Sequence, residues 1–295
     1  MSWKIKVPAT TANIGAGFDS IGIALNLYLT LTIEESNEWE FIPKSDHLKS
    51  LPRDQSNIIY QMAKKTAERH QISDLPACHV ELESDIPLAR GLGSSATAIV
   101  AGIELANQLA DLKLSSEEKV LLATEVEGHP DNVAPAVMGG CVVGHFDQTL
   151  DMIQIPIDNL VFVTMIPDFE LKTREARSIL PQQFTHGESV KASSVANVSV
   201  AAICQQNWSL LGKMFKKDSF HQPYRKTLIP YYDEIEEKLA NQVYGIYLSG
   251  AGPTMIALAS QKQVNQYLQQ WEENFPDLKW LTLEAVNQGA FIIKN

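Results

Sequence analysis

Cysteine and surplus positive charge are both scarce in this chain of 295 residues, and each shortage excludes a class of protein. The three cysteines, Cys78, Cys141 and Cys204, have neither a metal-binding nor a disulfide-framework spacing, which indicates reduced thiols. A net charge of -11 leaves no basic footprint, so we expect no nucleic-acid partner and no binding to an anionic membrane surface. No apolar run approaches the roughly 20 residues that cross a bilayer. A strand-like alternation from Trp3 to Val7 stands in place of a basic and apolar leader, so we expect a cytoplasmic protein.

The order of the predicted elements indicates the fold class. Strand-like and helix-like patterns interleave along the chain without repeats or low-complexity tracts, which predicts an α+β fold. The length suits one large or two ordinary domains. A polar, proline-containing turn near Pro156–Asn159 separates two apolar strand patterns. We therefore expect one domain over residues 1–157 and a second over residues 158–295.

The most informative segment is a glycine- and serine-rich stretch from Pro87 to Thr97, which reads P-L-A-R-G-L-G-S-S-A-T. It lies between a strand-like alternation, Cys78 to Asp85, and a helical pattern of small residues that begins near Ser94. Glycines let the backbone turn sharply and let a ligand approach closely. A helix N-terminus offers free N–H groups to an anion. The stretch therefore predicts a phosphate-binding loop.

Three interpretations of this loop compete. The first is an ordinary turn in which Ser94 or Ser95 caps the helix. The second is a dinucleotide site, since Gly91, Gly93 and Ala96 fit G-x-G-x-x-G/A, although a proline interrupts the preceding strand and no acidic strand end follows at the required distance. The third is a nucleoside-triphosphate site of a kind other than Walker A, because no lysine follows the last glycine. Backbone amides, hydroxyls and a metal ion would then hold the phosphates.

Four motifs in this chain resemble those of one family. The motif P-x-x-x-G-L-G-S-S-A resembles the ATP loop of the GHMP kinases, named for galactokinase, homoserine kinase, mevalonate kinase and phosphomevalonate kinase. Val7 to Leu25 and Glu127 to Gly140 are similar to segments of the homoserine kinases within that family, and Tyr247 to Thr254 resembles the family's C-terminal glycine motif. The resemblance implies the two-domain GHMP kinase fold. An N-terminal ribosomal-protein-like α/β domain and a C-terminal ferredoxin-like domain would enclose an active site in the cleft between them.

The resemblance also implies a reaction. We expect the γ-phosphoryl group of ATP to pass to the hydroxyl of L-homoserine, giving O-phospho-L-homoserine and ADP in threonine biosynthesis, in a homodimer that uses Mg²⁺. Asn57, at the start of a helical pattern, is a weaker candidate for nucleotide contact, because it is equally a helix-start residue. The expected ATP-binding residues are this one and the whole loop: Asn57, Pro87, Leu88, Ala89, Arg90, Gly91, Leu92, Gly93, Ser94, Ser95, Ala96 and Thr97.

A magnesium ion needs hard oxygen ligands and keeps several waters, so one hydroxyl and one carboxylate from the protein suffice. We expect Ser95 to supply the hydroxyl and Glu127 the carboxylate. Glu125, two residues earlier on the same helix end, remains an alternative. Without the motif around them, both acids would be read as a solvated helix face.

The resemblance implies a site for a small zwitterion. Asp19 would pair the ammonium group, and the guanidinium forks of Arg177 and Arg225 would hold the carboxylate. Arg174 lies close enough in sequence to Arg177 to be an alternative. Outside their motifs, these residues would be ordinary turn or surface residues. The full expected set of substrate-binding residues is Asn13, Asp19, His129, Asn132, Thr173, Arg177 and Arg225.

One departure concerns the mechanism. Some GHMP kinases place an aspartate as general base for the acceptor hydroxyl, whereas this loop reads H-P-D-N with Asn132 at that position and Asp131 beside it. We therefore expect in-line transfer without a carboxylate base, with Asn13, Asn132 and Arg177 nearest the reaction. The alternatives are a kinase of another small alcohol, such as mevalonate or a diphosphocytidyl polyol, a ligand sensor that lost catalysis, and a dehydrogenase.

Overall fold

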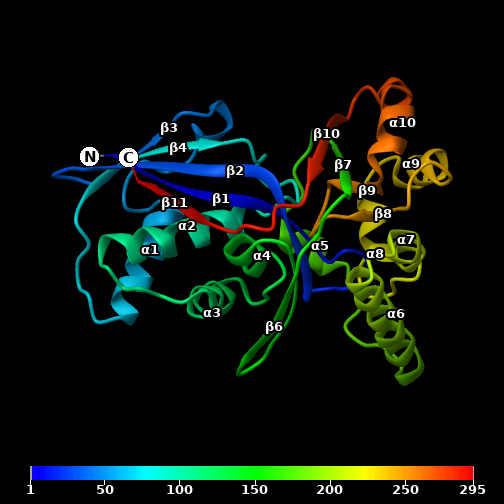
Figure 1. Ribbon diagram of the computed structural model, residues 1–295, viewed down its shortest axis with the longest axis horizontal. Coiled ribbons are helices and arrows are strands. Elements are labelled where there is room, and N and C mark those ends of the chain that lie inside the picture. Colours follow the sequence, from blue (N-terminus) through cyan, green and yellow to red (C-terminus); the bar gives the residue numbers. More distant parts are fainter. Residues whose placement is uncertain (1, 295) are drawn as a thin grey trace.

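The computed structural model describes residues 2–294 and contains two β-sheets with helices packed on them (Figure 1). This is the α+β architecture that the sequence predicts. The strands are β1 (Trp3–Ala12), β2 (Ile21–Glu35), β3 (Glu40–Pro43), β4 (Cys78–Ser84), β5 (Cys141–Phe146), β6 (Leu150–Ile155), β7 (Val161–Ile166), β8 (Gly245–Leu248), β9 (Met255–Ala259), β10 (Lys279–Glu284) and β11 (Phe291–Lys294). The α-helices are α1 (Ile58–Arg69), α2 (Ser94–Leu109), α3 (Ser116–Glu127), α4 (Val133–Met138), α5 (Thr173–Ser178), α6 (His186–Cys204), α7 (Trp208–Phe215), α8 (Gln222–Arg225), α9 (Tyr232–Leu239) and α10 (Gln261–Asn274).

The first sheet is built around the long strand β2. Its strand order is β11-β1-β2-β4-β3, and β5 pairs with the beginning of β2 and with β6. Residues 21–23 of β2 pair with β5, and residues 29–35 pair with β4, so one strand joins both parts of the sheet. All pairs are antiparallel except β3 with β4. The register of β1 shifts between Pro8 and Ala9, where proline has no N–H to donate.

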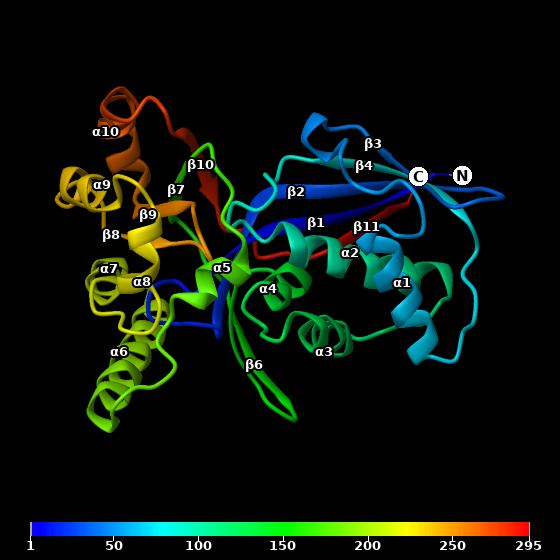
Figure 2. The same cartoon turned by 180° about the vertical axis from the view of Figure 1, so that it is seen from behind.

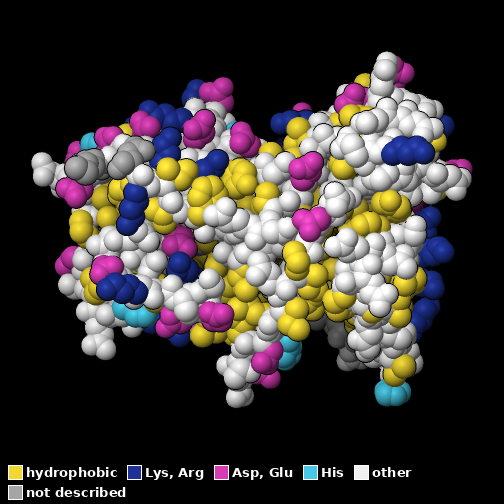
Figure 3. Space-filling view, in the orientation of Figure 1, with side chains coloured by type: hydrophobic (Ala, Val, Ile, Leu, Met, Phe, Trp, Pro, Cys, Tyr) yellow, Lys and Arg dark blue, Asp and Glu magenta, His cyan; other side chains and the backbone are white. Residues whose placement is uncertain are grey.

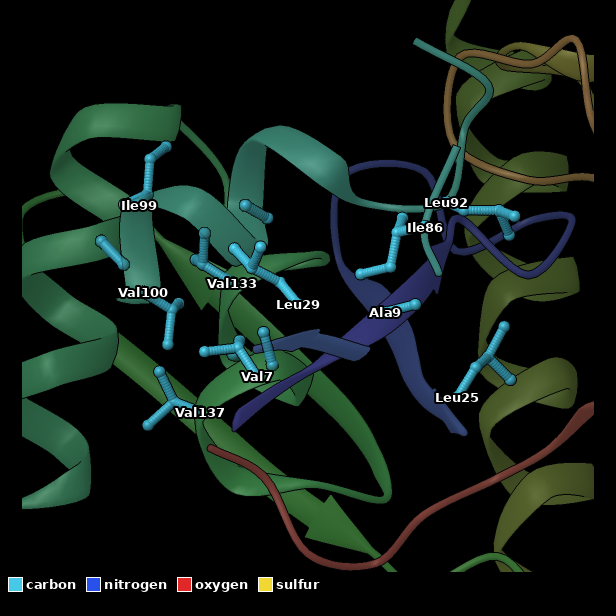
Figure 4. Packing of buried hydrophobic residues seen from close by; sticks show 14 of the residues in the cluster. Val7, Ala9, Leu25, Leu29, Ile86, Leu92, Ile99, Val100, Val133 and Val137 are labelled. Atoms are coloured by element: carbon cyan, nitrogen blue, oxygen red, sulfur yellow. The ribbon is translucent and has the colours of Figure 1, made fainter. Parts of the chain in front are cut away.

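Helices α1 to α4 cover one face of this sheet, as the reverse view shows (Figure 2). Figure 4 shows Val7 and Ala9 of β1 in the same apolar cluster as Ile99 of α2 and Val137 of α4. Nearly every side chain of α2 from residue 99 to residue 107 is buried, because the helix lies between the sheet and α1. The helical pattern of small residues that begins near Ser94 is therefore a buried helix.

The second sheet has the order β10-β7-β9-β8 and is antiparallel throughout. Helices α9 and α10 pack on it through a separate apolar cluster that includes Trp271 and Ile235. After β10 the chain returns to the first sheet, where β11 pairs with β1 (Figure 2). Strands from residues 158–294 therefore belong to both sheets. The expected division into residues 1–157 and 158–295 stays a prediction. Met1 and Asn295, the ends of those ranges, lie outside the described residues.

Local signals account for several helix ends. Ser115 and Glu118 form a capping box at the start of α3. Equivalent boxes begin α6 at Thr185 and α10 at Ser260. Helix α6 ends at Cys204, and Asn207 then caps α7 through its side chain, which accepts from the Leu210 N–H.

The charge and cysteine content noted in the sequence can be followed in the structure. Acidic and basic side chains are interspersed over most of the face in Figure 3, with Lys and Arg denser along its right-hand edge. No helix within residues 2–294 is long and apolar enough to cross a membrane. All three cysteines are free thiols, and burial raises the pKa of Cys78 to about 11 and that of Cys141 to about 12.

Helices α1 and α2 approach closely because Gly102 faces α1. A Cβ atom at this position would lie 2.5 Å from the Ile59 carbonyl oxygen and 2.5 Å from the Met62 Cβ. Such distances are far inside van der Waals contact, so a larger residue must push the helices apart. The absence of a side chain at Gly102 therefore sets the spacing of this helix pair.

We predict that Gly102→Ala lowers the free energy of unfolding by about 1–3 kcal/mol, because overpacking a tight interface costs that much. Gly187→Ala in α6 is the matched control, since no atom lies within 4 Å of a Cβ built there. The control should be neutral or stabilising by up to about 1 kcal/mol. Urea unfolding followed by circular dichroism measures both, and equal shifts for the two variants would contradict the packing explanation.

Candidate active site

The predicted phosphate loop connects β4 to α2. Gly91 and Gly93 have φ values of 76° and 72°, which a residue with a Cβ atom rarely adopts. Gly93 is the N-cap of α2, and no side chain caps the helix. The interpretation of Ser94 or Ser95 as an ordinary helix cap is therefore wrong. Both serines lie in the first turn of α2, where backbone N–H groups lack helical partners.

The phosphate loop packs closely against two segments that are distant from it in the sequence. A Cβ at Gly93 would lie 2.1 Å from the Thr10 hydroxyl oxygen at the end of β1. A Cβ at Gly91 would lie 2.3 Å from the Ser249 carbonyl oxygen in the turn after β8. The Ser249 hydroxyl donates to the Gly91 carbonyl oxygen. Both glycines are therefore required by the close approach of Thr10 and Ser249 as well as by their dihedral angles.

A cavity of about 290 Å³ lies beside the start of α2. Its walls come from the phosphate loop, the end of α3, the H-P-D-N segment, the start of α5 and the glycine turn after β8. The lining residues are Ala89, Gly91, Gly93, Ser94, Ser95, Ala96, Glu127, Asn132, Leu171, Lys172, Thr173, Gly250, Ala251 and Gly252. The loop and two of the other quoted motifs, Glu127 to Gly140 and Tyr247 to Thr254, thus meet around one cavity.

The two candidate acids at the end of α3 point in different directions. Glu127 lines the cavity and is half-buried, and this burial raises the pKa of its carboxyl group. Glu125 is exposed and forms an ion pair with Arg69 of α1. Of the two acids, Glu127 is therefore the one whose carboxylate lies beside the phosphate loop.

The charged residues expected to bind opposite ends of the substrate contact each other. Arg177 of α5 donates two hydrogen bonds to the Asp19 carboxylate, at 3.0 and 2.6 Å. These bonds raise the pKa of Arg177. The Asp19 N–H donates to the Asn13 side-chain oxygen at 3.0 Å, which fixes the turn between β1 and β2. Arg174, the alternative to Arg177, is exposed.

Arg225 is a buried residue with a relative exposure of 1% rather than a surface charge. Its Nε donates to the Ala176 carbonyl oxygen at 3.1 Å and its terminal nitrogen donates to the Gly250 carbonyl oxygen at 3.0 Å. Burial lowers the pKa of Arg225 to about 10, so its guanidinium group remains charged at neutral pH. A fixed, partly desolvated cation therefore lies beside α5 and the glycine turn.

The H-P-D-N segment forms a hydrogen-bonded chain toward β1. The Asp131 carboxylate pairs with the His129 ring and accepts a bond from the Asn132 amide nitrogen at 3.1 Å. The Asn132 oxygen accepts from the Thr10 hydroxyl at 3.0 Å. Burial opposes protonation of His129, but the hydrogen bond and charge of Asp131, with the charge of Asp19, raise its pKa overall. Asp131 thus faces the cluster rather than away from it, with its carboxylate already bonded.

Atoms of Asp19, His129 and Asp131 that bind cations lie within 4.8 Å of one another. The bonds described above occupy all three side chains, and Arg177 already neutralises Asp19. The same acidic oxygens suit an ammonium group as well as a metal ion.

Several expected ATP contacts lie away from the cavity. Asn57 caps α1, since its side chain accepts from the Ile59 N–H and donates to the Pro52 carbonyl oxygen. Leu92 and Thr97 are buried in the protein, each with 1% relative exposure. The remaining three, Pro87, Leu88 and Arg90, line a separate groove of about 640 Å³.

Arg90 holds the phosphate loop against the segment that follows β7. Its Nε donates to the Pro167 carbonyl oxygen at 3.2 Å, and a terminal nitrogen donates to the Leu88 carbonyl oxygen at 3.2 Å. The same side chain pairs with Glu170 at 3.5 Å. Arg90 is therefore placed to brace the loop.

Sequence reasoning overlooked some cavity residues. Leu171 and Lys172 precede the expected Thr173 and line the cavity with it. Gly250 and Gly252 belong to a quoted motif but were not expected as site residues. The motif that contains the two glycines could have identified them as site residues. Nothing in the sequence except its position next to Thr173 points to Lys172.

Comparison with known proteins identifies the class. The GHMP kinase N-terminal domain model matches residues 57–140, and the GHMP kinase C-terminal domain model matches residues 199–277. Curated relatives match nearly the whole chain at more than 40% identity. The chain belongs to the GHMP kinase family, whose members are ATP-dependent kinases of small molecules. The expected two-domain GHMP kinase fold is thereby confirmed.

The individual relatives are more specific. A homoserine kinase of Halalkalibacterium halodurans is 45% identical over 292 residues, 98% of this chain and 94% of the relative. A homoserine kinase of Bacillus velezensis is 43% identical over 297 residues, 100% of this chain and 96% of the relative. The crystal structure of a homoserine kinase from Cytophaga hutchinsonii has a TM-score of 0.87 at 29% identity, covering 99% of this chain and 97% of that one.

We predict that Arg90→Ala raises the KM for ATP about tenfold, because a looser phosphate loop loses roughly the worth of one charged hydrogen bond. Arg53→Ala is the control, since Arg53 is exposed and pairs only with Glu40 among the described residues. Steady-state kinetics at saturating second substrate measure both variants. A loss above about a thousandfold, or one confined to kcat, would contradict a bracing role.

Proposed function

We propose that this GHMP kinase phosphorylates L-homoserine, converting ATP and homoserine to ADP and O-phospho-L-homoserine. One observation carries the proposal: Gly250 lines the cavity together with the phosphate loop, and its carbonyl oxygen accepts hydrogen bonds from Asn13 and Arg225 of the expected acceptor site. A zwitterionic amino acid held by those charges lies next to a triphosphate held by the loop. The names of the full-length relatives support the same acceptor.

The acceptor site suits a small zwitterion. Asp19 and Arg177 currently satisfy each other through two hydrogen bonds. Homoserine brings an ammonium group for Asp19 and a carboxylate for Arg177 and Arg225, so neither half-buried charge of the Asp19–Arg177 pair loses its partner when it binds. Thr173, exposed at the start of α5, is placed to add a hydroxyl contact.

The ATP site relies on backbone groups and hydroxyls. The first turn of α2 presents N–H groups to the phosphates, and Ser94 and Ser95 line the same cavity. Glu127 adds a carboxylate there, and these hard oxygens fit Mg²⁺. Ser95 and Glu127 would hold the ion, which neutralises phosphate charge when bound. The protein would thus supply only two oxygens, because Mg²⁺ keeps several of its waters and also binds the phosphates of the substrate.

The reaction proposed here needs no carboxylate base. Asn132 lines the cavity and its amide is held by Thr10 and Asp131, so it can orient the acceptor hydroxyl. Asp131 has 2% relative exposure, and its carboxylate is bonded to His129 and Asn132. Asn13 anchors the turn that carries Asp19. Positioning and charge stabilisation would then supply the rate of an in-line transfer.

The resemblance to the homoserine kinases also supports a place in threonine biosynthesis, a cytoplasmic location and a homodimer. These remain proposals about the protein in its cell.

We predict that ATP turnover depends on homoserine and is absent with mevalonate or shikimate. Mevalonate has no ammonium group, so its binding would leave the Asp19 carboxylate without its proposed ligand. A coupled assay of ADP release over the three acceptors measures this, with homoserine omitted as the control. Turnover with mevalonate alone would reject the proposal, and tight binding of ATP and homoserine without ADP release would indicate a sensor. Binding of NAD would favour a dehydrogenase.

We predict that Glu127→Gln raises the Mg²⁺ concentration needed for half-maximal activity about 10- to 100-fold, the usual cost of disturbing a metal site. The matched control is Glu125→Gln on the same helix end, which loses only a surface ion pair with Arg69. Magnesium titrations of activity at fixed ATP compare the two. Equal effects, or a larger effect at Glu125, would overturn the assignment of Glu127.

A further inference from the structure

Phe18 lies between the residues that hold the two ends of the proposed substrate. It directly precedes Asp19 in the turn between β1 and β2. The Arg225 guanidinium carbon lies 5.1 Å from the centre of its ring, and that of Arg177 lies 5.4 Å away. One half-buried aromatic ring thus contacts both cations expected to bind the carboxylate.

Two guanidinium groups at one site repel each other. Burial and the positive charge of Arg177 both lower the pKa of Arg225. Asp19 neutralises Arg177, whereas Arg225 bonds two uncharged carbonyl oxygens. An aromatic ring attracts a cation through its negative face without using any of the N–H donors. Phe18 therefore stabilises both cations without occupying any of their N–H donors.

The ring is held from behind by His221. The two rings are stacked, with centroids 5.2 Å apart and planes 18° apart. His221 is fully buried, and its Nε2 lies 2.8 Å from the Gly15 carbonyl oxygen. Its backbone N–H donates to the Asp218 carboxylate. Burial lowers the pKa of His221, so a neutral imidazole backs the ring and adds no third cation.

We propose that Phe18 is a positioning residue for the acceptor carboxylate: its ring fixes the Arg177 and Arg225 guanidinium groups at the separation that one carboxylate bridges. The inference rests on homoserine being the acceptor. Phe18 is not among the residues that line the cavity beside the phosphate loop. Its removal should weaken binding of homoserine without slowing phosphoryl transfer once both substrates are bound.

Steady-state kinetics separate this role from a general structural one. Phe18→Leu keeps an apolar side chain but removes the ring, and we expect the KM for homoserine to rise about tenfold through loss of two cation–π contacts. The KM for ATP and kcat should stay within about twofold of the parent values. Phe18→Tyr keeps the aromatic face and should restore the parent KM. Phe146→Leu on β5, a similarly half-buried phenylalanine, is the control and should change none of these constants.

An NMR measurement tests the contacts of the Phe18 ring with Arg177 and Arg225 without requiring enzyme turnover. In protein labelled with ¹⁵N-arginine, the side-chain Nε–H signals of Arg177 and Arg225 are assigned from Arg177→Lys and Arg225→Lys. The ring current of Phe18 should displace both signals, and Phe18→Leu should return them toward ordinary arginine positions while Phe146→Leu leaves them in place.

These outcomes distinguish the role of Phe18 from the proposed function. Unmoved arginine signals in Phe18→Leu, or an unchanged KM for homoserine, overturns the role of Phe18 while the proposed function stands. A matching rise in the KM for ATP or a fall in kcat overturns it as well. Parent protein that fails to phosphorylate homoserine overturns the proposed function and the carboxylate role, and the NMR signals still decide whether the ring holds the arginines.

Discussion

The carbonyl oxygen of Gly250 is the point on which the site depends. It accepts hydrogen bonds from the Asn13 amide and from the Arg225 guanidinium group. The Gly250 N–H donates to the Ala12 carbonyl oxygen at the end of β1, and the neighbouring Ser249 hydroxyl donates to Gly91 in the phosphate loop. One turn therefore binds the two sheets, the loop and the acceptor cluster together. Loss of that turn would separate the phosphates from the acceptor.

The backbone around this point is strained. Asn13, Ile14 and Asp19 have φ values of 71°, 40° and 56°, in the left-handed region that residues with a Cβ usually avoid. Such strain persists only where surrounding contacts fix it, and it concentrates at functional sites. Here the fixing contacts are the Asn13 bond to Gly250 and the Asp19 pair with Arg177. The same bonds that define the acceptor site thus hold an unfavourable turn in place.

Local chemistry made much of the fold predictable, and long-range contact made the rest unpredictable. The capping box at Ser115 and the buried α2 follow from neighbouring residues, and so does the glycine turn of the phosphate loop. The pairing of Asp19 with Arg177 joins residues 158 positions apart, which no spacing rule reveals. Motif membership alone also gave no sign that the Arg90 side chain donates to the Pro167 carbonyl oxygen. Short helices such as α5 have too few turns to show a periodicity.

The central claim is that the phosphate loop and the acceptor cluster hold two substrates face to face across the Gly250 turn. A crystal structure with a non-hydrolysable ATP analogue, Mg²⁺ and L-homoserine tests it most directly. The account predicts the triphosphate on the first turn of α2 and the homoserine carboxylate between Arg177 and Arg225. The acceptor hydroxyl should lie in line with the γ-phosphorus. A nucleotide bound away from the loop, or a hydroxyl turned away from the γ-phosphate, would contradict it.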